Sequence, residues 1–223
     1  MAQSTLWKNA PTLKWSSIPK QGAIYITGHR GTGKTALAWR IADRRRGKNG
    51  YPEHVAAYGF PSNSLSALPE WVRHVDSPQQ IAALTEPHMI IIDESVFVVN
   101  SRRSQSNDNI EFTKLLAIIR HKGHLLIFIS QSSRQIDIQL VEGFDMILIK
   151  KPSLLQVRTV RDAIKPEIEQ AFKEFAEYTN QGGNHKKRVF MFDPHTGGTA
   201  MLPARMPDWW NDEVSRAYGE VTL

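Results

Sequence analysis

The eight residues from 28 to 35 combine glycines, a lysine and a threonine at a spacing that suits phosphate binding. They read Gly-His-Arg-Gly-Thr-Gly-Lys-Thr and fit the pattern G-x-x-x-x-G-K-[ST]. Glycines let the backbone curl so that successive N–H groups converge on phosphate oxygens, while the lysine reaches the β- and γ-phosphates and the threonine hydroxyl binds Mg²⁺. The loop therefore predicts a nucleoside triphosphate site formed by Gly28, His29, Arg30, Gly31, Thr32, Gly33, Lys34 and Thr35.

Two carboxylates, Asp93 and Glu94, directly follow the apolar residues 89–92. In a phosphate-loop protein, a carboxylate at the end of a buried strand holds Mg²⁺. The second carboxylate is placed to take a proton from an attacking water. A small-molecule kinase activates a substrate hydroxyl and has less need of this second group, so the pair favours triphosphate hydrolysis.

A glutamine and several arginines are candidates for completing the site. Gln131 follows the strand predicted over 125–130. If this strand lies between the loop strand and the Asp-Glu strand, the Gln131 amide would orient water or report hydrolysis. The alternative is that Gln131 caps the next turn. Phosphoryl transfer often uses an arginine supplied from elsewhere. The candidates, each of which has a surface arginine as its alternative, are Arg120, Arg134, Arg102 and Arg103.

The elements that would position these residues alternate along the chain. The apolar run 23–27 predicts a strand before the loop, and residues 35–46 predict a helix after it. Further strands are expected at 54–60, 88–94, 124–130 and 145–151, and further helices at 77–84 (with Asp76 as cap), 109–122 and 135–142. This alternation predicts a mostly parallel central sheet with helices on both faces. Together with the phosphate loop 28–35, it indicates a three-layer α/β sandwich of the P-loop NTPase (RecA/ASCE-like) class.

The residues after Pro152 follow a different pattern. Apolar residues three and four apart predict an amphipathic helix over 166–179. The segments 189–193 and 199–202 predict a hairpin, and a last helix is expected over 209–218. We therefore divide the chain into an N-terminal arm (1–22), a P-loop core (23–151) and a helical and hairpin extension (152–223) that packs on the same domain.

Composition limits the function classes. With 223 residues, 41% of them hydrophobic, the chain can bury one sizeable core. The absence of cysteine excludes a disulfide scaffold and a cysteine zinc site. No run is long enough to cross a bilayer and no signal peptide begins the chain, so we expect a soluble, non-secreted protein that is cytoplasmic or virion-associated. The net charge of +6, with basic clusters such as Lys150-Lys151, indicates either a polyanionic partner or plain solubility.

Three segments together resemble the FtsK/HerA superfamily of DNA-pumping ATPases: the loop 28–35, the strand 90–94 and the segment 119–131. The Arg-His-x-Gly approach to a strand that ends in glutamine is similar to two branches of it, the genome-packaging ATPases of tailless icosahedral viruses with membranes and the Zot-like phage assembly ATPases. The resemblance implies ATP and Mg²⁺ on Lys34 and Thr35, Mg²⁺ on Asp93, Glu94 as base and Gln131 as sensor. It also implies a homo-hexameric ring around nucleic acid, an arginine that reaches across the subunit boundary, and a capsid or membrane-vertex protein as docking partner.

The leading hypothesis is thus an ATP-driven translocase that packages double-stranded DNA into a virus. Zot-like proteins usually carry a membrane span after the ATPase domain, and its lack here favours the packaging branch. The alternatives are a Zot-like assembly or export ATPase, a nucleotide-dependent assembly switch and a small-molecule P-loop kinase. In the leading hypothesis, the polar loop 100–107 with its two arginines would grip DNA phosphates.

Overall fold

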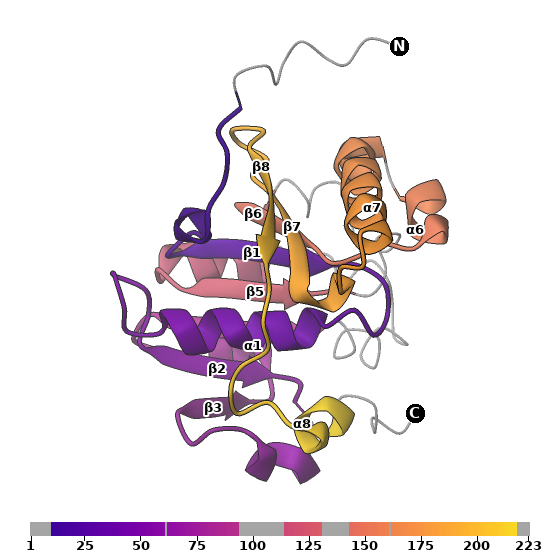
Figure 1. Cartoon of the computed structure of the whole chain (residues 1–223). Coiled ribbons are helices and arrows are strands. Elements are labelled where there is room, and N and C mark those ends of the chain that lie inside the picture. Colours follow the sequence, from indigo (N-terminus) through magenta and orange to yellow (C-terminus); the bar gives the residue numbers. More distant parts are fainter. Residues whose placement is uncertain (1–9, 61, 94–113, 131–142, 161, 218–223) are drawn as a thin grey trace.

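One eight-stranded sheet organises the chain, in a computed structural model that describes residues 10–60, 62–93, 114–130, 143–160 and 162–217. The strand order is β3-β2-β4-β5-β1-β6-β7-β8 (Figure 1). The strands are β1 (Gly22–Thr27), β2 (His54–Tyr58), β3 (Val72–Val75), β4 (His88–Asp93), β5 (Leu125–Ile129), β6 (Met146–Ile149), β7 (Arg188–Phe192) and β8 (Thr199–Pro203). The pairings from β3 to β6 are parallel, whereas β7 and β8 are antiparallel. The predicted mostly parallel sheet is confirmed.

Helices and short helical turns cover both faces of the sheet. The α-helices with named bounds are α1 (Lys34–Arg45), α2 (Pro78–Ala82), α6 (Leu154–Thr159), α7 (Lys165–Asn180) and α8 (Asp212–Ala217), and residues 114–121 are also helical. The 3-10 turns are η2 (Trp15–Ser17), η3 (Ser62–Ala67), η5 (Asp162–Ile164) and η6 (His185–Lys187). Among the described residues, no helix has both the length and the apolar character needed to cross a bilayer.

The core consists of two apolar layers, because successive side chains of each strand point to opposite faces of the sheet. On β1, Ala23 and Tyr25 face the layer that α7 and the helix 114–121 cover. Ile24 and Ile26 face the layer that α1 covers. Every residue of β1 is buried, on whichever face it lies, which explains why the sequence of this strand is a continuous apolar run. The predicted three-layer sandwich is confirmed.

The position of β5 between β1 and β4 aligns the carboxyl ends of these three strands. β5 lies between β1 and β4, and Ile129 pairs both with Ile26 of β1 and with Asp93 of β4. This is the strand order expected from the sequence. Because these strands are parallel, the phosphate loop after β1 and the carboxylate that ends β4 come to the same edge of the sheet.

Several local expectations were wrong. The helix α2 is capped by Ser77 rather than Asp76, because the Gln80 N–H donates to Ser77 Oγ at 3.3 Å. The Asp76 N–H instead donates to Gln80 Oε1 at 2.8 Å, which places Asp76 before the cap. The strand β3 and the helix α6 were not expected at all. The predicted helix 135–142 and the start of the predicted helix 109–122 lie outside the described residues.

The C-terminal hairpin is part of the central sheet. β7 pairs with β6, so the hairpin continues the central sheet. The last helix begins at Asp212 rather than 209, because the Asn211 side chain accepts the Val214 N–H at 3.0 Å and caps it there. Residues 204–211, which we call the C-terminal strap, run from the end of β8 across α1 toward the β3 side of the sheet (Figure 1).

Candidate nucleotide-binding site

The phosphate loop joins β1 to α1 and depends on backbone conformations that favour glycine. Gly28, Gly31 and Gly33 have φ values of 137°, 76° and 87°. Gly33 is the N-cap of α1, so the loop ends at the positive end of the helix dipole. At Gly28, a Cβ would lie 2.5 Å from the carbonyl oxygen of Lys150. The loop therefore packs directly against the end of β6.

The side chains of the loop hold its curvature. Lys34 is 6% exposed, and its Nζ donates to the carbonyl oxygens of Gly28 at 3.0 Å and His29 at 3.1 Å. Thr32 Oγ1 donates to the same His29 carbonyl at 2.6 Å. The His29 N–H donates to Lys151 O at 3.1 Å, while the Arg30 side chain is exposed at the mouth of the loop. The loop is thus closed around the lysine that the sequence assigned to the β- and γ-phosphates.

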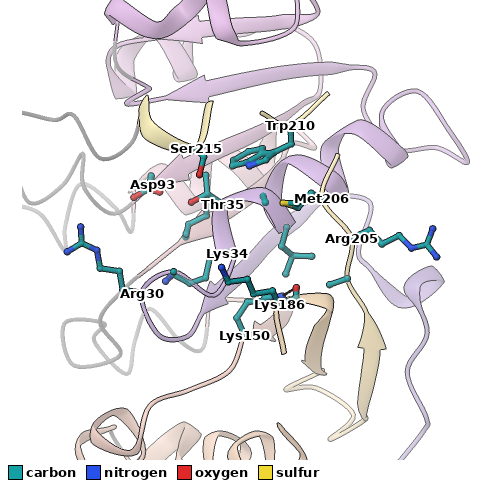
Figure 2. A pocket seen from close by; sticks show the side chains of 16 residues that line it. Arg30, Lys34, Thr35, Asp93, Lys150, Lys186, Arg205, Met206, Trp210 and Ser215 are labelled. Atoms are coloured by element: carbon teal, nitrogen blue, oxygen red, sulfur yellow. Dashed lines mark hydrogen bonds between the residues drawn. The ribbon is translucent and has the colours of Figure 1, made fainter. Parts of the chain in front are cut away.

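Asp93 and Thr35 meet in one pocket (Figure 2). Asp93 is the last residue of β4 and is 5% exposed. Ile91, two residues earlier, belongs to the apolar layer under α1, so alternation turns Asp93 toward the same helix. Thr35 lies in the first turn of α1. The two predicted Mg²⁺ ligands are thereby brought together.

The pocket has a volume of about 270 Å³ and a strongly basic lining. Among the described lining residues, Asp93 is the one carboxylate. The basic lining residues are Arg30, Lys34, Lys150, Lys186 and Arg205. Burial and the nearby Lys151, Lys150 and Lys186 together lower the pKa of His185, as expected beside a concentration of positive charge. Such a pocket favours a highly charged anion.

Lys150 is a feature of the site that the sequence did not reveal. The pair Lys150-Lys151 has the sequence of a basic surface cluster, but Lys150 is 1% exposed and directly follows β6. Its Nζ donates to the carbonyl oxygens of Lys186 at 2.7 Å and Arg188 at 2.6 Å, and burial lowers its pKa to about 7. The available signal was its place directly after four buried apolar residues, the same relation that Asp93 has to β4.

Arg120 is not brought to this pocket within one chain. Its side chain is exposed and donates to the Gly143 carbonyl oxygen at 3.0 Å, ahead of β6. Parallel strands begin at the edge opposite the pocket, so the guanidinium lies at that opposite edge. A role of Arg120 across a subunit boundary stays a prediction. Glu94, Gln131, Arg134, Arg102 and Arg103 lie outside the described residues.

The rest of the Arg-His-x-Gly segment has structural contacts at the same opposite edge. Lys122 Nζ donates to the Leu84 carbonyl oxygen at 2.9 Å, and Gly123 ends the helix 114–121 with a φ of 67°. His124 is fully buried, and its Nδ1 accepts the His88 N–H at 2.9 Å. Burial, together with His88 and Lys122, lowers the pKa of His124 to about 4. These residues join the helix to β4 and β5.

The donors present fit ATP and Mg²⁺. The glycine loop leaves open space at Gly31, where a Cβ would meet no atom within 4 Å, so an anion has access to the backbone. No group of three metal-ligating side chains gathers within the described ranges. Mg²⁺ fits one hydroxyl and one carboxylate, because it takes its remaining ligands from water and substrate phosphates.

These observations define the class of the fold. A glycine loop follows the central strand β1, a carboxylate ends β4, and β5 is inserted between these two strands. This is the architecture of a P-loop NTPase with the additional central strand of the RecA/ASCE-like group. The sequence matches no family model and no curated protein.

Solved structures with this architecture include viral and bacterial ATPases. The genome packaging NTPase B204 from Sulfolobus turreted icosahedral virus 2, in complex with ATP-gammaS, matches with a TM-score of 0.56 and 13% identity over 84% of this chain and 100% of that chain. The cytoplasmic domain of the Thermomonospora curvata type VII secretion ATPase EccC matches with a TM-score of 0.51 and 12% identity, over 84% of this chain and 24% of that one.

The pCW3 conjugation coupling protein TcpA, in its monomer form with ATPgS, matches with a TM-score of 0.50 and 9% identity, over 89% of this chain and 64% of that one. At these identities the likeness concerns the fold. It agrees with the resemblance to FtsK/HerA-type and viral packaging ATPases drawn from the sequence.

Proposed function

We propose that this protein is an ATP-hydrolysing translocase that pumps double-stranded DNA, as a viral genome-packaging ATPase does. The observation that carries the proposal is the convergence of Lys34, Thr35 and Asp93 in one basic pocket beside an inserted central strand. The likeness to the whole of B204 supports the packaging assignment over a generic nucleotide-binding role.

We assign the residues of the proposed site separate roles in ATP hydrolysis. Lys34 would release its loop carbonyls to bind the β- and γ-phosphates, with Arg30 and Lys186 nearby to offset charge. Thr35 and Asp93 would hold Mg²⁺, which supplies charge neutralisation on the phosphate oxygens. Glu94 would accept the proton of the attacking water, and Gln131 would orient that water.

A nucleic-acid partner and a ring are parts of the same proposal. The net charge of +6 favours a polyanion, and the arginines of the loop 100–107 are our candidates for contacts with DNA phosphates. We propose a homo-hexamer, in which an arginine of one subunit completes the site of the next, docked on a capsid or membrane-vertex protein.

The likeness to EccC and TcpA supports a second candidate, a translocase that serves export or transfer rather than packaging, as Zot-like proteins do. A nucleotide-dependent switch would share the pocket but turn over little ATP. A small-molecule kinase would transfer phosphate to a metabolite instead of water.

The deciding experiment measures ATP hydrolysis by the full chain with and without double-stranded and single-stranded DNA. We expect stimulation by double-stranded DNA above that by single-stranded DNA, and loss of turnover but retained ATP binding in Glu94→Gln. Double substitution of Arg102 and Arg103 by alanine should lower the stimulated rate more than the basal rate. Tight binding without turnover would contradict the motor and support the switch.

A further inference from the structure

The nucleotide pocket changes character along its length. Around the phosphate loop its lining is basic, through Arg30, Lys34, Lys150 and Lys186. On the side of the C-terminal strap, Leu37 from α1 and Ala204, Met206 and Trp210 from the strap add apolar surface, with Arg205 as the one charged strap residue in the lining. Met206 is 60% exposed, one of few large apolar side chains left in solvent among the described residues. This gradient suits a ligand with a charged end and an apolar end.

The loop fixes the direction in which such a ligand would lie. Lys34 marks the β- and γ-phosphates, whereas the backbone that follows it at the start of α1 faces the α-phosphate. In Figure 2, Asp93 and Arg30 lie to the left of Lys34 and Thr35, and Met206 and Arg205 lie to the right. A triphosphate with its metal near Asp93 therefore directs its nucleoside toward the strap.

The two consecutive tryptophans of the strap have different surroundings. Trp209 packs edge-on against Trp39 and Trp71, with ring centroids 5.8 and 6.1 Å apart. Trp210 is half-buried and lines the pocket. The first indole thus anchors the strap to α1. The second lies against the first, with ring centroids 6.1 Å apart, and also lines the pocket.

Further contacts hold the strap in place. Asp208 lies 3.3 Å from Arg40 and 3.2 Å from Arg44 on the outer side of α1. At the other end, the Ala204 N–H donates to the Lys187 carbonyl oxygen at 2.8 Å. The strap is therefore held at Ala204 and at Asp208, both ahead of Trp210, before any ligand binds. This reduces the ordering cost of binding.

We propose that the strap forms the nucleobase subsite of this pocket, with the Trp210 indole stacking on the base and Met206 packing beside it. The inference rests on the proposed nucleotide function but concerns the base rather than the phosphates. A flat indole stacks on purines and pyrimidines alike, so this subsite adds affinity for a base with little dependence on its identity.

The test compares two magnesium-bound ligands on the full-length protein by calorimetry: ATP, and inorganic tripolyphosphate, which has the phosphates but no base. We expect wild type to bind ATP roughly ten-fold or more tightly than tripolyphosphate, the range that base–aromatic stacking supplies. Trp210→Ala should reduce this ratio to about two-fold or less by removing the stack, and Trp210→Phe should restore most of it. Retained tripolyphosphate binding by Trp210→Ala shows that the variant is folded.

Trp71→Phe is the matched control, because Trp71 contacts the same aromatic cluster but does not line the pocket. It should keep the wild-type ratio. An unchanged ratio in Trp210→Ala overturns the subsite, as does equal affinity of wild type for both ligands, and the proposed nucleotide function survives either result. Failure of wild type to bind either ligand overturns both proposals.

Discussion

Two buried lysines stand at the centre of the site, and their side chains satisfy backbone carbonyls in different parts of the chain. Lys34 donates within its own loop, to Gly28 and His29. Lys150 donates to Lys186 and Arg188, at the turn that leads into β7. Because Lys150 also packs on Gly28, it joins the phosphate loop to the hairpin. We infer that its first role is to position the loop.

The lowered pKa of Lys150 gives the fold a specific dependence on pH. Between about 7, its pKa in the folded chain, and its ordinary value of 10.5, the unfolded chain holds a proton that the folded chain has released. Raising the pH through this window therefore stabilises the fold, by at most about 1.4 kcal/mol per pH unit. Well below pH 7, Lys150 is protonated in both the folded and the unfolded chain, so it no longer makes the free energy of unfolding depend on pH.

Urea unfolding of wild type and Lys150→Met at pH 7 and 9 tests this expectation. The stability of wild type relative to the variant should rise with pH, because methionine keeps the aliphatic stem but cannot titrate. Lys48→Met, at an exposed position, is the control and should follow wild type. Parallel curves for wild type and Lys150→Met would show that the Lys150 amine does not lose its proton on folding.

For single residues, the sequence predicted those positions in the site that follow from local spacing. The positions of Lys34, Thr35 and Asp93 follow from a contiguous loop and from the end of an apolar run, and the structure brings them together. The surroundings of Lys150 depend on carbonyls 36 and 38 residues further along the chain. No local pattern encodes such a contact, so a buried lysine looked like a surface one.

At the scale of elements, the glycines of the phosphate loop differ in how much space surrounds them for a side chain. Gly28→Ala would force a Cβ to within 2.5 Å of Lys150 O at a φ of 137°. Gly31→Ala meets no atom within 4 Å, although its φ of 76° is also positive. The first substitution displaces the loop from β6, whereas the second adds only local backbone strain.

We expect Gly28→Ala to lower the free energy of unfolding by about 3 kcal/mol or more, through overpacking added to strain. Gly31→Ala should lower it by about 1 kcal/mol. Denaturant titration of both variants measures the difference. Equal losses would mean that the contact between Gly28 and Lys150 does not constrain the loop.

Some elements differ from expectation because tertiary contacts outweigh local propensity. The short strand β3 has only one fully buried residue, Val75, so its sequence has no apolar run. Trp209 and Trp210 look like the start of a helix, but the first packs on Trp39 and helix α8 begins later. The helix α6 did carry a readable signal, since Ser153 and Gln156 form a capping box.

At the scale of the whole molecule, the pocket and Arg120 occupy opposite edges of the sheet. Such a separation suits a ring only if the edge that carries the arginine meets the pocket edge of a neighbour. Arg120 and Arg134 are two of the four arginines that we named as candidates for this role.

Mixing two inactive variants tests this arrangement. If Arg120 acts across the boundary, Arg120→Ala and Glu94→Gln should each be inactive alone but regain hydrolysis when mixed, because some interfaces then combine an intact base with an intact arginine. Arg134→Ala should be mixed in the same way, and light scattering should show assemblies of six 25.3-kDa chains. Mixtures no more active than their components would contradict a shared site.

The N-terminal segment has a consequence for how such chains associate. Thr12 forms a parallel bridge with Thr199 at the start of β8, and Trp15 Nε1 donates to Pro203 O at its end, 3.1 Å away. An uncovered outer strand can recruit a strand of another copy and seed aggregates. With both ends of β8 held by its own chain, and Pro203 unable to donate a backbone hydrogen bond, we expect copies not to add a strand at β8. Contacts between copies on this side of the sheet should therefore be made by side chains.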